Sequence, residues 1–254
     1  MNILDSIILG IVEGLTEFLP ISSTGHLILV SKLLGLEQTE AHKAFEVAIQ
    51  SGAILAVVFL YRERLIHSID LWKRLIVAFI PTGVLGFLLY KLIKGLFSPY
   101  IVSIMLIVGG FVFIAVEFLY KRSQHQIDDI LKIPYYKAFL IGVFQSIAMI
   151  PGTSRSGATI IGGLLLGLDR KTAAEFSFLL AVPTMFAATS YDIMKNYNNF
   201  HTDNWLTMLI GFITAFIFAV LAIKLFIGFV SRYSFIPFGI YRIILGFIFL
   251  FFVL

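Results

Sequence analysis

Residues 13–26 read Glu-Gly-Leu-Thr-Glu-Phe-Leu-Pro-Ile-Ser-Ser-Thr-Gly-His and interrupt a hydrophobic region that covers residues 3–34. A second interruption, Pro-Gly-Thr-Ser-Arg-Ser-Gly-Ala-Thr at 151–159, lies within the hydrophobic region 135–168. Each region is too long for one membrane-spanning helix, which needs about 20 apolar residues. Non-helical backbone at membrane depth occurs only where it is buried in protein or lines a wet cavity. We therefore expect two re-entrant helix hairpins, each with its turn inside the membrane.

The whole chain has the composition of a membrane protein. Of its 254 residues, 59% are hydrophobic and 13% are charged, and the mean hydropathy is +0.96. A soluble domain carries about 25% charged residues, so this chain cannot cover itself with polar surface and needs the bilayer as its solvent. Six further segments are long and apolar enough to span a membrane. They are 44–61, 73–93, 100–119, 172–191, 206–230 and 236–254.

We therefore predict an all-α, polytopic membrane protein with six transmembrane helices and two re-entrant helix hairpins, in a single membrane domain over 1–254. The net charge of +4 and the absence of basic runs argue against a nucleic-acid partner. Cysteine is absent, which excludes disulfides, a thiol nucleophile and a thiolate metal site. The first residues lack the basic segment and cleavage site of a signal peptide, so we expect them to belong to the mature chain.

The two interrupted regions resemble each other. With one gap, their alignment pairs Pro20 with Pro151 and Ser23 with Ser154. A hydrophobic span that begins with similar Ala, Glu and Phe residues follows each of them. We interpret the chain as an inverted repeat, in which one hairpin enters from each face and the two turns meet near the membrane midplane. The halves are approximately 1–125 and 130–254.

Basic residues in the predicted loops indicate the orientation. The alternating path of the chain places eleven of them on one side and five on the other, and the richer side is expected to be cytoplasmic. The active site then opens to the external or periplasmic side of a bacterial inner membrane. The eleven are Arg62, Arg64, Lys73, Arg74, Lys121, Arg122, Lys132, Lys137, Arg170, Lys171 and Arg232, and the five are Lys32, Lys43, Lys91, Lys94 and Lys195.

Glu13 and Glu17 are four residues apart, so both project from one face of the first half-helix. Two carboxylates in hydrocarbon are costly unless a counter-ion or a shared proton stabilises them. They favour a hard divalent cation, Mg²⁺ or Ca²⁺, bound by oxygen ligands and water. The alternative is a pair buried against basic partners for packing. Glu46 and Gln50 share a helix face and are expected either to support this site or to form a structural pair.

After Pro20, a hydroxyl-rich segment should restart the helix. Ser22 or Ser23 is suited to cap it, and the free N–H groups of the new helix form a seat for phosphate. Ser23 is a candidate nucleophile and His26 a candidate base or nucleophile, since a hydroxyl needs a neighbouring group to activate it. A cap is the alternative role for either serine, and a hydrogen-bonded core position is the alternative for His26.

The second interruption combines glycines, hydroxyls and an arginine. Ser154, Ser156 and Thr159 contribute hydroxyls, and successive N–H groups form a nest for phosphate oxygens. Arg155 adds a planar guanidinium that matches phosphate, and an arginine within a hydrophobic hairpin needs an anionic partner. A salt bridge to the carboxylate pair of the first hairpin is the alternative partner, and it is compatible with phosphate binding.

These motifs resemble those of a known family. Segments 13–26 and 151–159 are similar to the two signature motifs of bacterial undecaprenyl-diphosphate phosphatases, also called bacitracin-resistance proteins. The similarity extends over essentially the whole chain, including 45–50 and 169–176. It implies hydrolysis of undecaprenyl diphosphate to the monophosphate and inorganic phosphate. This reaction recycles the lipid carrier for peptidoglycan synthesis, and it gives bacitracin resistance because that antibiotic sequesters the diphosphate.

The resemblance also implies roles for individual residues, while serine, histidine and water all stay open as the attacking group. By motif position, it implies metal binding by Glu13 and Glu17, catalysis by Glu17, Ser23 and His26, and phosphate binding with transition-state stabilisation by Ser154, Arg155 and Thr159.

The alternative from another class is a transporter or flippase for a phosphorylated polyprenyl lipid, because inverted repeats with broken helices are typical of transporters. The Glu/Ser/His and Arg/hydroxyl groups favour phosphoryl chemistry over transport. Besides the polyprenyl diphosphate, membrane lipids are the expected partners. The sequence leaves the oligomeric state open between a monomer and a homodimer.

Overall fold

The computed structural model describes residues 1–120, 126–195 and 205–252. Within these ranges the chain is helical, and the β-type pairing is limited to an isolated bridge between Ile127 and Leu168. The prediction of an all-α chain is therefore confirmed. The helices are α1 (Ile3–Thr16), α2 (Ser23–Leu33), α3 (Glu40–Leu60), α4 (Arg62–His67), α5 (Ile69–Leu88), α6 (Tyr90–Gly95), α7 (Pro99–Leu119), the 3₁₀ helix η1 (Ile130–Lys132), α8 (Tyr135–Ile147), α9 (Arg155–Leu165), α10 (Arg170–Lys195), α11 (Trp205–Val230) and α12 (Ile236–Phe252).

Among the described residues, five helices are long and apolar enough to cross a membrane, namely α3, α5, α7, α10 and α11. The predicted sixth span, 236–254, corresponds to α12, which begins at Ile236 as predicted and is described for 17 residues, as far as Phe252. The predicted span 73–93 differs, because α5 ends at Leu88 and the separate helix α6 follows. The five long apolar helices are those of a multi-pass membrane protein.

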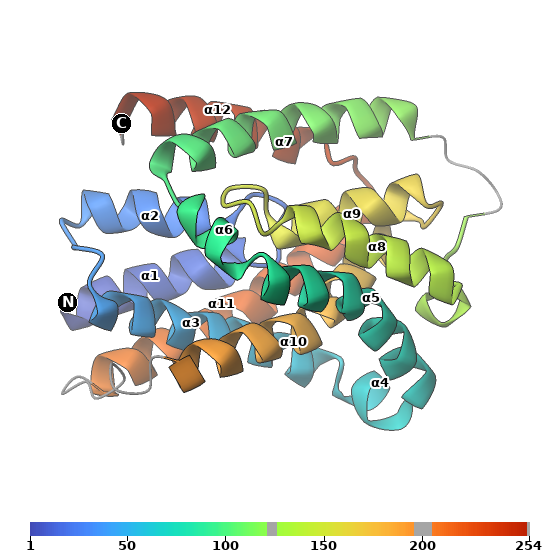
Figure 1. The fold of residues 1–254 in the computed structure, drawn as a ribbon, viewed down its shortest axis with the longest axis horizontal. Coiled ribbons are helices and arrows are strands. Elements are labelled where there is room, and N and C mark those ends of the chain that lie inside the picture. The colour runs from blue at the N-terminus through green and yellow to red at the C-terminus, as the bar shows by residue number, and fades with distance from the viewer. Residues whose placement is uncertain (121–125, 196–204, 253–254) are drawn as a thin grey trace.

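Both predicted interruptions occur as breaks between paired helices. The first turn, residues 17–22, joins α1 to α2, and the second turn, residues 148–154, joins α8 to α9. Figure 1 shows that the two hairpins extend from opposite ends of the molecule, so that their turns meet near its centre. The Ser156 hydroxyl at the start of α9 donates to the Leu19 carbonyl oxygen at 2.8 Å. Segments 137 residues apart in the sequence are therefore in direct contact at the two turns.

Ser22 and Ser154 occupy equivalent positions at the ends of the two turns. Each has a left-handed backbone, with φ of 70° and 75°, and each side-chain oxygen accepts a hydrogen bond from the amide three residues later. The predicted pairing of Ser23 with Ser154 is therefore wrong by one residue. Ser23 instead matches Arg155, because both are the first residue of the helix that follows the turn. The alignment was anchored on Pro20 and Pro151, which lie at different distances from these caps.

Glycines determine how closely α1 approaches α11. A Cβ added at Gly10 would lie 2.7 Å from the carbonyl oxygen of Gly211, and one at Gly14 would lie 2.5 Å from that of Ala215. Larger side chains would push the two helices apart, since real Cβ atoms do not approach backbone oxygens so closely. This contact therefore fixes the position of α1 and of the carboxylates that it carries.

The largest buried apolar cluster draws side chains from α3, α5 and α7 to α11 and includes Phe18 of the first turn. The ring of Phe18 packs edge-on against that of Phe178 in α10, with a centroid distance of 5.4 Å. The first turn is thus anchored on the apolar core, although it also carries charged and hydroxyl groups.

Candidate active site

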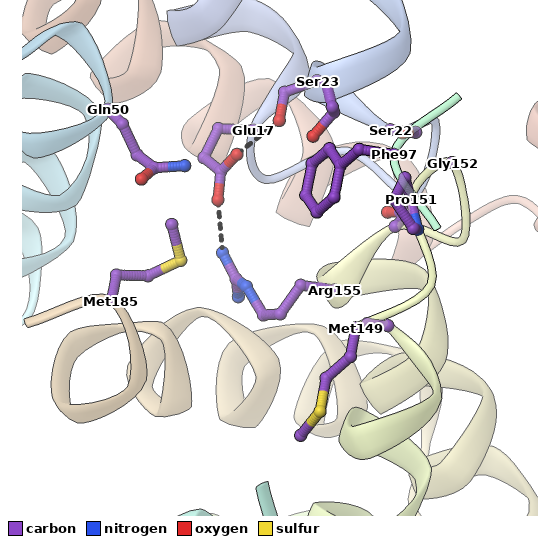
Figure 2. A pocket seen from close by; sticks show the side chains of 13 residues that line it. Glu17, Ser22, Ser23, Gln50, Phe97, Met149, Pro151, Gly152, Arg155 and Met185 are labelled. Carbon is purple, nitrogen blue, oxygen red and sulfur yellow. Dashed lines mark hydrogen bonds and ion pairs between the residues drawn. The ribbon is translucent and has the colours of Figure 1, made fainter. Parts of the chain in front are cut away.

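A cavity of about 130 Å³ lies where the two turns meet. Its polar lining comes from both hairpins and from α3, and its apolar lining includes Phe97, Met149 and Met185 (Figure 2). Its size suits a polar headgroup rather than a long hydrocarbon chain. The polar side chains in the lining are Glu17, Ser22, Ser23, Thr24, Gln50, Ser154 and Arg155.

Glu17 connects the two hairpins across this cavity. Its Oε1 accepts a hydrogen bond from Nη2 of Arg155 at 3.1 Å, and its Oε2 accepts one from the Ser23 hydroxyl at 2.6 Å. Figure 2 shows the carboxylate between these two partners. The salt bridge that the sequence left open as a partner for Arg155 therefore exists. The structure also shows that the group in contact with the Ser23 hydroxyl is Glu17 and not His26.

The Arg155 guanidinium is held from three sides. Besides its bond to Glu17, Nη1 donates to the Ser177 carbonyl oxygen at 2.9 Å, and the guanidinium carbon lies 5.5 Å from the centre of the Phe18 ring. Its Nε is buried and has no hydrogen-bond partner among the described residues. The same holds for the hydroxyl of Thr153 in the second turn. Because buried polar atoms are normally hydrogen-bonded, the free Nε of Arg155, which lines the cavity, indicates that a polar ligand binds there.

Glu13 lies one helical turn before Glu17 and is buried, with an exposed fraction of 1%. Neither of its carboxylate oxygens has a hydrogen-bond partner among the described residues. A buried carboxylate without a partner is strongly destabilising unless a proton or a cation compensates it. The predicted pairing of Glu13 with a bound cation is therefore compatible with its surroundings.

A metal ion at this pair would need ligands from outside the protein. The described part of the chain contains no group of three or more His, Cys, Asp or Glu side chains that could hold a metal ion. Two carboxylates supplemented by water and phosphate oxygens are a usual arrangement for Mg²⁺. The residues present thus fit a cation that binds together with a phosphorylated ligand.

Ser22 and Ser154 act as helix caps at the edge of the cavity. The Ser22 oxygen accepts from the amide of Gly25 at 3.4 Å, and that of Ser154 accepts from the amide of Gly157 at 3.1 Å. A non-glycine residue with positive φ is uncommon, and such strain is often found at functional sites. Two turns with the same strained cap place two helix amino ends at one cavity, which favours an anionic ligand.

His26 is not among the described residues that line the cavity. Its Nδ1 lies 2.8 Å from the Ser22 carbonyl oxygen, and its Nε2 lies 2.7 Å from the hydroxyl of Tyr241, whose ring stacks on the imidazole. Because a carbonyl oxygen can only accept, Nδ1 carries the hydrogen, and Nε2 of a neutral ring accepts from Tyr241. In this arrangement His26 supports the start of α2. Its predicted catalytic role stays a prediction.

Ser156 and Thr159 lie behind the cavity rather than in its lining. Ser156 donates to the first turn, as described above, and the Thr159 hydroxyl donates to Oγ of Ser177 at 2.6 Å. Since the Ser177 carbonyl oxygen also accepts from Arg155, these contacts hold the guanidinium in place. Their predicted phosphate contacts stay predictions, and the structure shows them as supports of the residues that line the cavity.

The predicted supporting pair on α3 is divided between two places. Gln50 lines the cavity directly, so it lies closer to a ligand than the sequence indicated. Glu46 is paired with His42 at 3.2 Å, and His42 also contacts the Ser31 hydroxyl at 3.0 Å. His42 therefore joins α3 to α2, and Glu46 pairs with it within α3, whereas Gln50 lines the cavity.

Sequence reasoning missed two residues of α12, Tyr241 and Arg242. Tyr241 orients His26, and Arg242 is completely buried with an exposed fraction of 0%. A signal was present, because an arginine inside an apolar segment is expected to have a functional or structural partner. The apolar lining residues Phe97, Met149 and Met185 carried no such signal in the sequence.

The chain is similar to known proteins over nearly its whole length. Residues 6–248 match the family described as bacitracin resistance protein BacA. An undecaprenyl-diphosphatase of Persephonella marina is 89% identical over 254 residues, which is 100% of both chains. A protein of the same name from a Sulfurihydrogenibium species is 66% identical over 246 residues, which is 97% of both chains. Another, from Aquifex aeolicus, is 54% identical over 246 residues, which is 96% of both chains. With nearly its full length matched and these identities, the chain belongs to the bacitracin resistance protein BacA family.

Proposed function

We propose that this protein hydrolyses undecaprenyl diphosphate to undecaprenyl phosphate and inorganic phosphate. Full-length relatives carry the name of this activity, and the cavity between the turns holds the kinds of group that phosphoryl transfer requires. In a bacterial cytoplasmic membrane, the reaction recycles the lipid carrier for peptidoglycan synthesis and gives bacitracin resistance.

The observation that carries the proposal is the position of Glu17 between the Ser23 hydroxyl and the Arg155 guanidinium. A carboxylate next to a hydroxyl can take its proton, and a guanidinium can neutralise charge on a phosphoryl group. The Ser23 hydroxyl and the Arg155 guanidinium both contact Glu17. A phosphate bound between them would therefore lie next to a nucleophile, a general base and a positive charge at once.

The chemistry then follows from these three residues. Phosphate oxygens of the substrate replace the Glu17 carboxylate on Arg155, and Glu17 takes the proton of Ser23 as the serine oxygen attacks the terminal phosphorus. The bond from that phosphorus to the bridging oxygen breaks, and undecaprenyl phosphate leaves with the proton from Glu17. Water then attacks the phosphoserine, Glu17 accepts a proton from this water, and inorganic phosphate leaves as the proton returns to Ser23.

Glu13 and Glu17 are the residues that would hold a divalent cation, Mg²⁺ or Ca²⁺. A bound cation would neutralise part of the negative charge of the diphosphate. Gln50 lies across the cavity from the second turn and offers an amide to orient the headgroup. The polyprenyl chain leaves on the side of Phe97 and Met149, where the lining is apolar.

The orientation in the membrane belongs to the same proposal. The α1–α2 and α8–α9 hairpins are re-entrant, α12 completes a set of six spans, and the cavity opens to the external side. The asymmetry of basic residues and the central position of both turns support this arrangement. Two residues of the basic set, Lys121 and Arg122, lie outside the described residues.

Phosphate release from undecaprenyl diphosphate by the purified protein in detergent tests the activity, with and without EDTA. Glu17→Gln should lower turnover by about 100-fold or more, because it removes the general base. The control is Glu40→Gln, which alters an exposed carboxylate paired with Lys43 and should leave turnover unchanged. Release in detergent also separates an enzyme from a transporter, since transport needs a sealed membrane. Unchanged turnover of Glu17→Gln would contradict the proposed role.

A further inference from the structure

Arg242 is a fully buried arginine whose hydrogen bonds to the described residues are all to backbone oxygens. It lies on α12 and has an exposed fraction of 0%. None of the ion pairs between described residues involves it, and it does not line the cavity. A buried guanidinium is costly unless its donors are satisfied, so its partners show what it does.

These partners come from both turns and from α7. Nη1 donates to the carbonyl oxygen of Pro20 in the first turn at 3.1 Å, and Nη2 donates to that of Gly152 in the second turn at 3.0 Å. Nη2 also donates to the Met105 carbonyl oxygen at 3.0 Å, and Nε to that of Leu106 at 3.4 Å. One rigid, planar group therefore joins the two turns to each other and to a long helix.

Glycines at the contact between α7 and α12 make room for the Arg242 side chain. A Cβ added at Gly109 of α7 would overlap the guanidinium of Arg242. The helices also touch closely beside it, since a Cβ at Gly239 would lie 2.8 Å from the carbonyl oxygen of Gly110. The glycines thus leave room for the arginine to cross α7 and reach the turns.

The turn carbonyls need such a donor. Pro20 and Gly152 lie where the helices are broken, and broken backbone inside a membrane protein has to find hydrogen bonds within the protein. Each carbonyl lies two residues before the strained serine that starts the next helix. A shift of either carbonyl would therefore move Ser23 or Arg155 relative to Glu17.

We propose that Arg242 is a positioning residue that holds the two turns at the separation in which Ser23 and Arg155 both contact Glu17. This role rests on the proposed phosphatase function, because it concerns the same site. Arg242 does not touch the substrate. Its guanidinium fixes the distance between the nucleophile on one hairpin and the phosphate-binding group on the other.

The test compares Arg242→Gln and Arg242→Lys with Arg74→Gln as the matched control. Arg74 is also buried and donates to a backbone carbonyl, that of Ile133 at 2.8 Å, in a contact that involves neither turn. Arg242→Gln should lower kcat by about 100-fold with little change in KM, because misplacement of reacting groups by about 1 Å has that effect. Arg242→Lys keeps the charge but loses the planar guanidinium that reaches both turns, so its kcat should lie between those of the wild type and Arg242→Gln. Arg74→Gln should change kcat little.

Hydrogen–deuterium exchange gives a second readout that does not depend on activity. The amides of 17–22 and 148–154 should exchange faster in Arg242→Gln than in the wild type, and they should be unchanged in Arg74→Gln. Gly109→Ala, which displaces the guanidinium without removing it, should show the same pattern and serves if Arg242→Gln does not fold.

Equal kcat in Arg242→Gln and Arg74→Gln, or unchanged exchange in both turns, would overturn the positioning role. A wild-type protein that releases no phosphate would instead overturn the proposed function. In that case the exchange experiment still decides whether Arg242 holds the turns.

Discussion

The guanidinium of Arg155 donates to the carboxylate of Glu17 at 3.1 Å and so connects two turns that are 138 residues apart in the sequence. Each hairpin brings one half of this ion pair, the Glu17 carboxylate from the first and the Arg155 guanidinium from the second. Neither hairpin holds this pair alone. The activity should therefore depend on how the turns are held together as much as on the reacting residues.

Ser22 and Ser23 should respond differently to substitution, although they are neighbours. Ser23→Ala removes the hydroxyl that contacts Glu17 and should lower turnover by about 100-fold or more. Ser22→Gly removes a cap, and glycine both suits the φ of 70° and costs only a few tenths of a kcal/mol at this position. Steady-state phosphate release from both variants checks this. Comparable losses would show that Ser23 has no special role.

Glu13→Gln should stabilise the protein when no cation is present. The substitution removes a buried carboxylate for which the described residues provide no hydrogen-bond partner, and with it the cost of burying that charge. The temperature of unfolding in EDTA should therefore rise, while the Mg²⁺ concentration needed for half-maximal turnover should increase. A lower unfolding temperature in EDTA would show that Glu13 has a compensating partner in the cation-free protein.

Tyr241→Phe tests the support of His26. Loss of one hydrogen bond is worth about 0.5–1.5 kcal/mol, so turnover should fall by roughly 2- to 12-fold. If Tyr241 acts only through the imidazole, the same substitution should have no further effect in a His26→Ala background. Equal losses in both backgrounds would show that the two residues act independently.

Gly14→Ala and Gly228→Ala form a pair that separates packing from helix propensity. A Cβ at Gly14 would meet the backbone of α11, whereas a Cβ at Gly228 of α11 would have no atom of the described residues within 4 Å. Gly14→Ala should therefore lower the unfolding temperature and the turnover, because it displaces α1. Gly228→Ala should be neutral or stabilise the protein by up to about 1 kcal/mol. Thermal unfolding in detergent distinguishes the two outcomes, and equal effects would contradict the packing described for α1.

Much of the architecture could be predicted because the bilayer leaves few choices. Composition alone indicated a membrane protein, and proline and charged residues inside hydrophobic regions marked the two breaks. The salt bridge between Arg155 and Glu17, which the sequence offered as the alternative to a phosphate partner, reflects the cost of isolated charges in hydrocarbon. Five of the expected spans appeared as long helices, and α12 begins at Ile236, where the sixth span was expected to begin, and is described as far as Phe252.

The details of the site could not be predicted, because they depend on backbone angles and on contacts between distant segments. Nothing local in the sequence indicates that Ser22, rather than Ser23, has positive φ and matches Ser154. The sequence spacing of Ser23 and His26 suggested a reactive pair, yet the imidazole turns to Tyr241, which lies 215 residues away. Arg242 was overlooked because its partners are carbonyl oxygens, which any sequence contains.

The most direct test of the joint site is phosphate release from undecaprenyl diphosphate by the purified Arg155→Ala protein in Mg²⁺. We expect turnover to fall by about 100- to 1,000-fold relative to the wild type, because the charge on the transferred phosphoryl group loses its main counter-charge. Arg64→Ala, which breaks an ion pair with Glu175 outside the cavity lining, should retain near-normal turnover. Near-normal turnover of Arg155→Ala would mean that the chemistry does not occur between the two turns.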